Sequence, residues 1–417
     1  MIPFHYRDGG LCVERVPLSR IAEEVGTPCY VYSRGRIEQN WRAYDEAFGD
    51  HPHLVCYAVK ANGTLAVLDI LASLGSGFDI VSGGELHRVE WAGGDLSKVV
   101  FSGVGKTRAE IEAAVAAGIA CIDVESIEEI DRVSQTAGSL GRSAPVALRV
   151  NPDVDPNTHP YIATGLKTAK FGIGIDEALE TYRYAAGMTG IDIRGVACHI
   201  GSQLMDTAPL LDAFGRLLDL VDTLEVNGIG IRHIDAGGGL GIGPSETPGP
   251  DRGKWVAAML EVMHRRGRRD LELFVEPGRS IVGDAGILLT RVEYLKTSGD
   301  KRFAVVDAGM NDLLRPALYQ ARHDMLTVKK PAGAGDVYDV VGPVCESADV
   351  LGTSRRMSLV VGDLIAITDA GAYGSVMASN YNARTRPAEV VADGDQFQVV
   401  RRRETFDDMV ALETRLL

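Results

Sequence analysis

The sequence predicts an α/β protein in which a TIM-like (β/α)8 barrel is followed by a mostly antiparallel β domain. Short apolar runs alternate with helix-like segments between residues 54 and 275, a pattern typical of parallel βαβ units. There are eight such runs, which is the number of strands in a closed α/β barrel. Beyond about residue 280 the strand-like runs follow one another without long helices, which indicates a separate β domain.

The predicted barrel strands are short runs rich in aliphatic and β-branched residues. They lie at 54–59, 78–81, 98–101, 120–124, 145–150, 193–198, 231–235 and 271–275. Helix-like segments lie between them at 64–74, 84–92, 107–117, 126–137, 176–187, 206–227 and 253–266. Thr107 and Glu110 have the spacing of a capping box at the start of one helix. A doubly wound open sheet is the competing arrangement, and the eight strand candidates favour the barrel over it.

The second domain is predicted from consecutive strand-like runs. They lie at 285–295, 302–307, 336–341, 363–368, 387–391 and 396–401. The N-terminal runs Leu11–Val16 and Cys29–Tyr32 fall outside the barrel count, and we expect them to join this domain. We therefore expect a barrel over residues 34–280 and a β domain formed by residues 1–33 and 281–417.

Composition excludes several classes of protein. The chain has 417 residues, of which 45% are hydrophobic and 24% are charged, so it is neither disordered nor collagen-like. A net charge of -14 argues against a nucleic-acid or anionic-membrane partner, because both attract clustered basic residues. No run reaches the ~20 apolar residues of a membrane span. The first residues show no basic region followed by an apolar run, so we expect no signal peptide.

The six cysteines form no C-x-x-C pair, which speaks against a zinc ribbon or a thioredoxin-like motif. Cysteines this sparse in a long chain predict reduced thiols and a cytoplasmic location. No metal site is predicted.

Four chemically distinctive groups follow predicted barrel strands, and barrels of this kind carry their active sites at the carboxyl ends of the strands. Lys60 ends the first strand, His199 ends the sixth, and the glycines 237–239 end the seventh. Glu276 ends the eighth, with Gly278 and Arg279 directly after it. Each has an ordinary explanation: a surface lysine, a core histidine, a tight turn, an acidic residue at a strand end. Their convergence on one face favours a functional site.

The glycine run at 237–239 offers backbone amides that can bind a phosphate group. A dinucleotide fingerprint starting at Gly237 is excluded, because it needs a glycine where Ile242 stands. The run SGVGKT at 102–107 is not a phosphate loop, because Val100 occupies the place of the first required glycine. What remains is a phosphate site after the seventh strand, with Gly278 contributing after the eighth.

A lysine amine, a carboxylate, a stacking ring and a phosphate loop together predict pyridoxal phosphate as the cofactor. A lysine beside desolvating walls loses its proton more easily, which suits Schiff-base chemistry at Lys60. A carboxylate such as Glu276 keeps a pyridine nitrogen protonated. In the second domain, Cys345 and Tyr373 stand in glycine-flanked loops, where functional side chains concentrate. Further candidates there are Glu346, Arg315 and Tyr319.

These residues lie in motifs through which the chain resembles the diaminopimelate decarboxylases, which are pyridoxal phosphate decarboxylases of the alanine racemase fold. The motifs run nearly end to end: YAVKAN at 57–62, FDIVSGGEL at 78–86, VNPDVDPNTHPYIATGLKTAKFGI at 150–173, HIGSQL, DAGGGLGI, EPGRSIV, DAGMNDLLRPALY, GPVCESADVL and SNYNARTRPAEV. The resemblance implies the same two domains, decarboxylation of meso-2,6-diaminopimelate to L-lysine and CO2, and an obligate homodimer. It implies that Cys345 and Glu346 reach the partner's active site.

The resemblance also implies a role for each candidate. Lys60 would hold the cofactor covalently, His199 would stack on its ring and Glu276 would bond its ring nitrogen. Cys345 would return a proton after decarboxylation. The phosphate would be held by Ser202, Gly238, Gly239, Gly278 and the Arg279 backbone, with Tyr373 nearby. The substrate would be bound by Arg279, Arg315, Tyr319, Glu346 and Tyr373.

Three other functions remain as alternatives. A decarboxylase of another basic amino acid, of the ornithine or arginine type, would share the barrel, but the segments RPALY and CES favour diaminopimelate. A racemase of this fold uses arginine at the ring nitrogen, which Glu276 argues against. A non-catalytic pyridoxal phosphate carrier would not need the residues past the barrel, with Cys345 and Tyr373.

Overall fold

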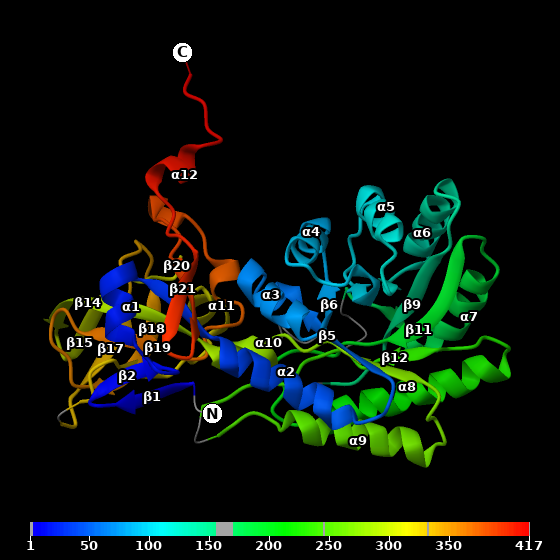
Figure 1. The fold of residues 1–417 in the computed structure, drawn as a ribbon, viewed down its shortest axis with the longest axis horizontal. Helices are drawn as coiled ribbons and strands as arrows, with labels where there is room; N and C mark the ends of the chain where they lie inside the picture. The colour runs from blue at the N-terminus through cyan, green and yellow to red at the C-terminus, as the bar shows by residue number, and fades with distance from the viewer. Residues whose placement is uncertain (1–2, 156–169, 245–246, 332, 417) are drawn as a thin grey trace. The chain divides into compact units, whose positions relative to one another are not determined.

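The computed structural model describes residues 3–155, 170–244, 247–331 and 333–416, and its chain is traced in Figure 1. The part of the 150–173 motif between residues 156 and 169 lies outside the described residues. The chain divides into two compact units. The barrel unit comprises residues 39–281, and the β unit comprises residues 1–38 and 282–417.

Eight parallel strands form the barrel, and β8 pairs with both β7 and β9, so the sheet closes on itself. An open doubly wound sheet is therefore excluded. The strands are β5 (His53–Ala58), β6 (Gly77–Ile80), β7 (Val99–Phe101), β8 (Cys121–Val124), β9 (Ala144–Asn151), β11 (Ile191–Ala197), β12 (His233–Asp235) and β13 (Glu272–Val275). The short strand β10 (Ile173–Gly174) pairs with β9 at its end.

Helices follow the barrel strands, as Figure 1 shows for this unit. They are α3 (Leu65–Ser73), α4 (Gly83–Trp91), α5 (Arg108–Ala117), α6 (Ile127–Ser139), α7 (Ile175–Ala186), α8 (Ala208–Val226), α9 (Arg252–Arg265) and α10 (Arg279–Val282). All eight predicted strands and all seven predicted helices are confirmed, with bounds that differ by two residues at most. The capping box of Thr107 and Glu110 is confirmed at the start of α5.

Helix α2 (Arg34–Phe48) precedes β5 and was not predicted. Its sequence is mostly polar, but Ile37, Trp41, Tyr44 and Phe48 are buried. These residues recur at spacings of four, three and four, which places them on one face of a helix. The sequence therefore carried the apolar stripe of a helix here. It was not predicted because it precedes the first strand of the strand-helix alternation on which the prediction rested.

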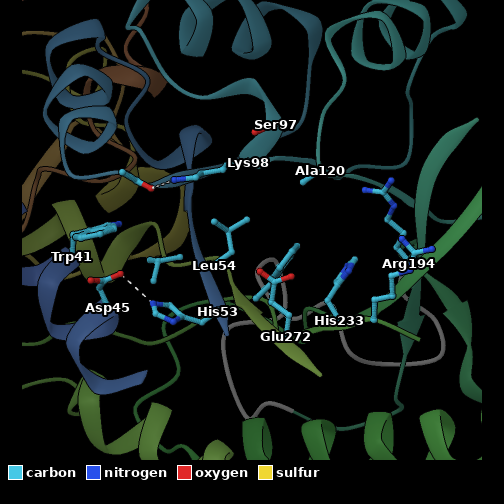
Figure 2. A pocket seen from close by; sticks show the side chains of 14 residues that line it. Trp41, Asp45, His53, Leu54, Ser97, Lys98, Ala120, Arg194, His233 and Glu272 are labelled. Carbon is cyan, nitrogen blue, oxygen red and sulfur yellow. Dashed lines mark hydrogen bonds and ion pairs between the residues drawn. The ribbon is translucent and has the colours of Figure 1, made fainter. Parts of the chain in front are cut away.

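Small side chains fill the middle of the barrel. Cys56, Val100, Cys121, Ala147 and Ala197 form one buried cluster together with Phe274. At the amino ends of the strands, this core gives way to a cavity of about 560 Å³ lined by Leu54, His233, Glu272 and other residues (Figure 2). The residues predicted to be functional follow the opposite, carboxyl ends of the strands, so this cavity is not the predicted site.

The β unit is built on a sheet in which most neighbours are antiparallel. Its strand order is β18–β17–β15–β14–β4–β20–β21, with β19 pairing β14 and β16 pairing β19. Among the described residues of this unit, only the β15–β17 and β4–β20 pairs are parallel. The strands are β4 (Cys29–Ser33), β14 (Gly286–Ser298), β15 (Lys301–Val306), β16 (Met325–Thr327), β17 (Asp336–Val341), β18 (Val350–Met357), β19 (Leu364–Ile367), β20 (Ala388–Asp393) and β21 (Gln396–Arg401).

An N-terminal sheet and short helices complete this unit. They are β1 (Phe4–Arg7), β2 (Gly10–Val13), β3 (Val16–Pro17), α1 (Leu18–Val25), α11 (Arg315–Tyr319) and α12 (Phe406–Val410). One buried cluster joins residues of β2, α1, β4, β14 and β20, so the N-terminal segment shares the core of the C-terminal strands.

Candidate active site

Lys60 lies directly beyond β5, in the one-turn 3-10 helix Val59–Ala61. Its Nζ donates a hydrogen bond to Asp79 Oδ2 at 2.5 Å. Asp79 is fully buried in β6, whereas the Lys60 side chain is 34% exposed. A buried carboxylate thus holds the amine at the carboxyl end of the barrel while leaving it accessible.

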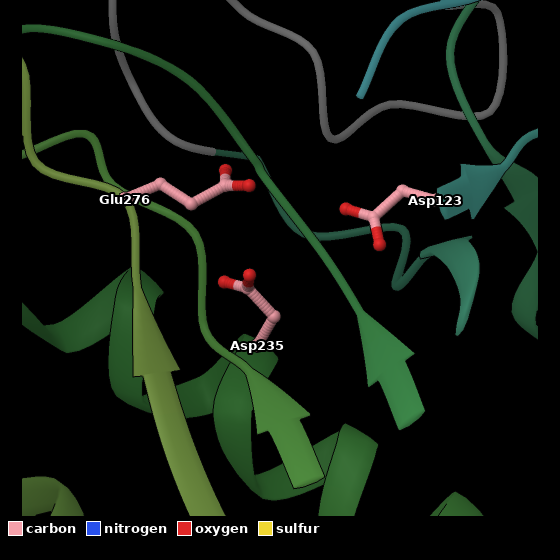
Figure 3. Close-up of side chains that lie close together, drawn as sticks. All are labelled: Asp123, Asp235 and Glu276. Atoms are coloured by element: carbon pink, nitrogen blue, oxygen red, sulfur yellow. The ribbon is translucent and has the colours of Figure 1, made fainter. Parts of the chain in front are cut away.

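Three further carboxylates, at or next to the carboxyl ends of β8, β12 and β13, point at one another (Figure 3). Oxygens of Asp123, Asp235 and Glu276 all lie within 4.8 Å of each other, and the three residues are buried. Ser102 Oγ lies 3.1 Å from Asp123 Oδ2 and 3.3 Å from Glu276 Oε1. Sequence analysis identified Glu276 but missed both aspartates.

Burial dominates the electrostatics of these carboxylates. It raises the pKa of Asp123 to about 7 and raises the pKa of Asp235 and of Glu276 well above the usual range. Asp123 Oδ1 and Asp235 Oδ2 are buried, and within the described ranges neither has a hydrogen-bond partner. Buried acceptors without a donor are costly, so the cluster is suited to a bound group that brings a positive charge or an N–H donor.

The glycines after β12 pack directly against the ends of the neighbouring strands. A Cβ atom at Gly238 would lie 2.2 Å from the carbonyl oxygen of Glu276. Asp235 Oδ1 accepts a hydrogen bond from Gly237 N at 2.7 Å. Gly238 N donates to His199 Nδ1 at 3.3 Å. The glycine run therefore lies between the residues that follow β11 and those that follow β13.

His199 lies two residues beyond the end of β11 and is half-buried. Desolvation lowers the pKa of this imidazole well below its ordinary value. The ring is therefore neutral at pH 7, which suits stacking on a flat cofactor rather than charge pairing.

Gly278 and Arg279 follow β13, and Arg279 is the first residue of α10. A Cβ atom at Gly278 would lie 2.9 Å from the Cβ of Ala61, next to Lys60. The buried Arg279 guanidinium donates to Ser202 Oγ, with Nη2 at 3.0 Å. The barrel unit thus gathers Lys60, His199, Ser202, Gly238, Gly239, Glu276, Gly278 and Arg279 at the carboxyl ends of its strands.

The other predicted residues belong to the β unit. Arg315 begins α11 and is buried, with its guanidinium 5.9 Å from the centre of the Tyr319 ring. Cys345 and Glu346 are exposed in the loop between β17 and β18. Tyr373 follows β19 and has a left-handed backbone, with φ of +55°. All five side chains stand in loops or at a helix end of this unit.

The sequence contained a signal for the missed carboxylates. Asp79 and Asp123 each interrupt an apolar strand, in FDI and CIDV, and Asp235 ends the buried strand HID. An acidic residue inside a buried parallel strand is rare unless it is paired, so its position alone marks a functional candidate.

None of the helices in the described ranges combines the length and the apolar character that crossing a membrane requires.

Comparison with known proteins gives consistent matches over the whole chain. Residues 34–283 match the family model described as pyridoxal-dependent decarboxylase, pyridoxal binding domain. The diaminopimelate decarboxylase of Pseudomonas aeruginosa is 57% identical over 416 residues, covering 100% of both chains.

Two crystal structures, both with L-lysine, resemble the chain closely. Diaminopimelate decarboxylase from M. jannaschii is 38% identical with a TM-score of 0.95, over 99% of this chain and 98% of that one. The Helicobacter pylori enzyme is 41% identical with a TM-score of 0.91, over 95% and 99% of the two chains.

Proposed function

Because the chain belongs to the diaminopimelate decarboxylases, within the pyridoxal-dependent decarboxylase family, we infer that it converts meso-2,6-diaminopimelate to L-lysine and CO2. This reaction is the last step of lysine biosynthesis, and the enzyme is a carboxy-lyase. The full-length identity to a diaminopimelate decarboxylase is the observation that carries this conclusion.

The residues at the carboxyl ends of the barrel strands fit pyridoxal phosphate. Buried carboxylate oxygens of Asp123 and Asp235 lack donors within the described ranges, as expected where a protonated ring nitrogen is to be bound. The glycines at 237–239 approach their neighbours too closely for any side chain, so only the backbone can face an anion there. When bound, the cofactor supplies an electron-poor ring that accepts the electron pair of the breaking carbon–carboxylate bond.

Each cofactor-binding residue has a proposed role. Lys60 would hold the cofactor covalently through its amine, Glu276 would accept a hydrogen bond from the ring nitrogen, and His199 would stack on the ring. The phosphate would be held by Ser202, Gly238, Gly239, Gly278 and the Arg279 backbone, with Tyr373 nearby. The neutral state of His199 and the accessibility of Lys60 support these assignments.

Substrate is recognised at both ends. Arg279 and Arg315 meet the distal carboxylate, since a guanidinium donates two parallel hydrogen bonds to a carboxylate. Glu346 pairs with the distal ammonium, and Tyr319 and Tyr373 complete the pocket. Lysine lacks the second carboxylate and would leave a buried arginine unpaired, so we expect it to be a poor substrate.

Cys345 donates the proton to the carbon that has lost CO2. Its place in an exposed loop of the β unit supports an arrangement in which Cys345 and Glu346 serve the active site of a second copy. The functional form is therefore a cytoplasmic homodimer. Residues 34–280 bind the cofactor, while residues 1–33 and 281–417 form the domain that supplies these two side chains.

A substrate panel tests the proposal. Release of CO2 is measured with purified protein and added cofactor on diaminopimelate, ornithine, arginine and lysine. We expect turnover of diaminopimelate alone. Preferred turnover of ornithine or arginine would identify a different decarboxylase, and binding of the cofactor without CO2 release would identify a non-catalytic carrier.

A further inference from the structure

Two consecutive side chains hold the loop that carries Cys345 and Glu346. Asn382 Oδ1 accepts a hydrogen bond from Cys345 N at 3.1 Å. The neighbouring Tyr381 donates a short hydrogen bond from Oη to Glu346 Oε1. Both contacts lie within the β unit, and each joins residues more than thirty positions apart in the sequence.

The backbone has an unusual conformation at Asn382 and at the residue after it, Ala383. Asn382 has φ of +56° and Ala383 has φ of +54°, both in the left-handed region. Asparagine tolerates this region better than most residues, whereas a left-handed alanine is uncommon. Such backbones persist only where the surroundings fix them, and they cluster at functional sites.

Hydrogen bonds on both sides fix the segment. Asn380 Nδ2 donates to Arg384 O at 3.0 Å and to Glu404 Oε2 at 2.7 Å. Ser379 N donates to Asn311 O at 2.9 Å. The Tyr381–Asn382 pair is therefore held by a local frame and does not depend on its contacts with Cys345 and Glu346.

The Cys345 loop is anchored to the same frame. Asp349 is buried and accepts from Val344 N at 2.7 Å and from Met310 N at 2.6 Å. Met310 is the neighbour of Asn311, to which Ser379 bonds. The loop that carries Cys345 is thus bonded to Met310, and the segment that carries Tyr381 is bonded to Asn311. Both are therefore anchored at the same two consecutive residues.

We propose that Tyr381 and Asn382 are positioning residues that present the Cys345 thiol and the Glu346 carboxylate as one preset pair. Asn382 fixes the main chain of Cys345, and Tyr381 fixes the direction of the Glu346 carboxylate. The inference rests on the proposed roles of Cys345 and Glu346. The hydrogen bond to Glu346 also raises the pKa of Tyr381, so its hydroxyl remains a donor throughout the neutral range.

The two contacts are expected to affect different kinetic constants. Tyr381→Phe frees the carboxylate that binds substrate and is expected to raise KM about tenfold, with kcat nearly unchanged. Asn382→Gly keeps the left-handed backbone but removes the acceptor, and is expected to lower kcat about tenfold or more, with KM nearly unchanged. Asn382→Asp retains an acceptor oxygen and should recover part of kcat.

Matched controls separate positioning from loss of structure. Tyr294→Phe alters a tyrosine that is 68% exposed and whose hydroxyl makes no hydrogen bond in the described ranges. Ala383→Gly relaxes the second left-handed residue without touching Cys345. Both variants are expected to match the wild type, and all variants should share its thermal midpoint and its cofactor absorbance.

Double-mutant cycles decide the outcome. Tyr381→Phe should have no further effect on KM in a Glu346→Ala protein, and Asn382→Gly should have no further effect on kcat in a Cys345→Ala protein. Effects that persist in those backgrounds, or wild-type kinetics in Tyr381→Phe and Asn382→Gly, would overturn the inference. If instead Cys345→Ala and Glu346→Ala themselves behaved as wild type, the proposed roles of those residues would be wrong.

Discussion

Lys60 and Asp79 form an ion pair at the carboxyl end of the barrel, with 2.5 Å between Nζ and Oδ2. Lys60 lies just beyond β5 and Asp79 lies near the end of β6, and these two strands are adjacent and parallel. The ion pair therefore fixes the direction of the Lys60 amine at the carboxyl end of the barrel.

Lys60→Ala and Lys60→Arg are both expected to abolish CO2 release and the visible absorbance of the lysine-bound cofactor. The arginine variant keeps a positive charge beside Asp79, so its failure would show that the amine itself is required. Lys98→Ala, at the amino ends of the strands, serves as the control and should keep both signals. Retained absorbance and activity without the Lys60 amine would contradict the assignment.

Cys345→Ala is expected to leave cofactor binding intact and to slow turnover by about 10²–10⁴-fold, because a positioned proton donor is lost. Cofactor absorbance and CO2 release measured on the same sample separate the two effects. Cys345 is the exposed cysteine of the chain, and the other five are buried. An unchanged kcat would remove the proton-donor role.

Gly238→Ala is expected to weaken cofactor binding about tenfold or more, because its Cβ would lie 2.2 Å from the carbonyl oxygen of Glu276 and force the loop outward. Cofactor titration followed by absorbance gives the dissociation constant. The matched control is Gly230→Ala, where a Cβ atom meets nothing within 4 Å. Equal affinity in the two variants would argue against a phosphate loop at residues 237–239.

Asp123→Asn is expected to stabilise the cofactor-free protein in a pH-dependent manner. Burial raises the pKa of Asp123 to about 7, above its value of about 3.9 in an unfolded chain, so the wild type loses stability as the pH rises from about 4 to about 7. The amide does not titrate and avoids this loss.

Thermal unfolding at pH 5 and pH 7.5 checks this prediction. The Tm of Asp123→Asn should exceed that of the wild type by more at pH 7.5 than at pH 5. Each kcal/mol of unfolding free energy that the variant regains should raise Tm by about 2–4 °C. An excess that is equal at both pH values, or larger at pH 5, would show that Asp123 ionises without cost in the folded protein.

The fold was predictable where local patterns agree with the tertiary structure. Each barrel strand is a short apolar run followed by an amphipathic helix, so periodicity alone located them. Strand β18 was missed because it lies at an edge of its sheet and its middle residues, Thr353 to Arg356, are mainly exposed. The parallel pairs of the β unit join strands distant in sequence, and no local signal encodes such pairing.

The site was predictable as a set of residue types at strand ends. Convergence of Lys60, His199 and Glu276 follows from the barrel topology once the strands are known. The carboxylate cluster was missed because each aspartate was read as part of its strand, and only the closed sheet brings Asp123 and Asp235 to within 4.8 Å of Glu276.

The two oxygens of Asp235 face different neighbours: Oδ1 accepts from Gly237 N, while Oδ2 lies in the carboxylate cluster with Glu276. One side chain thus joins the glycine turn to the carboxylate cluster. A substitution at Asp235 would therefore disturb the turn at Gly237 and the cluster together, whereas the loops that carry Arg315 and Glu346 belong to the other unit.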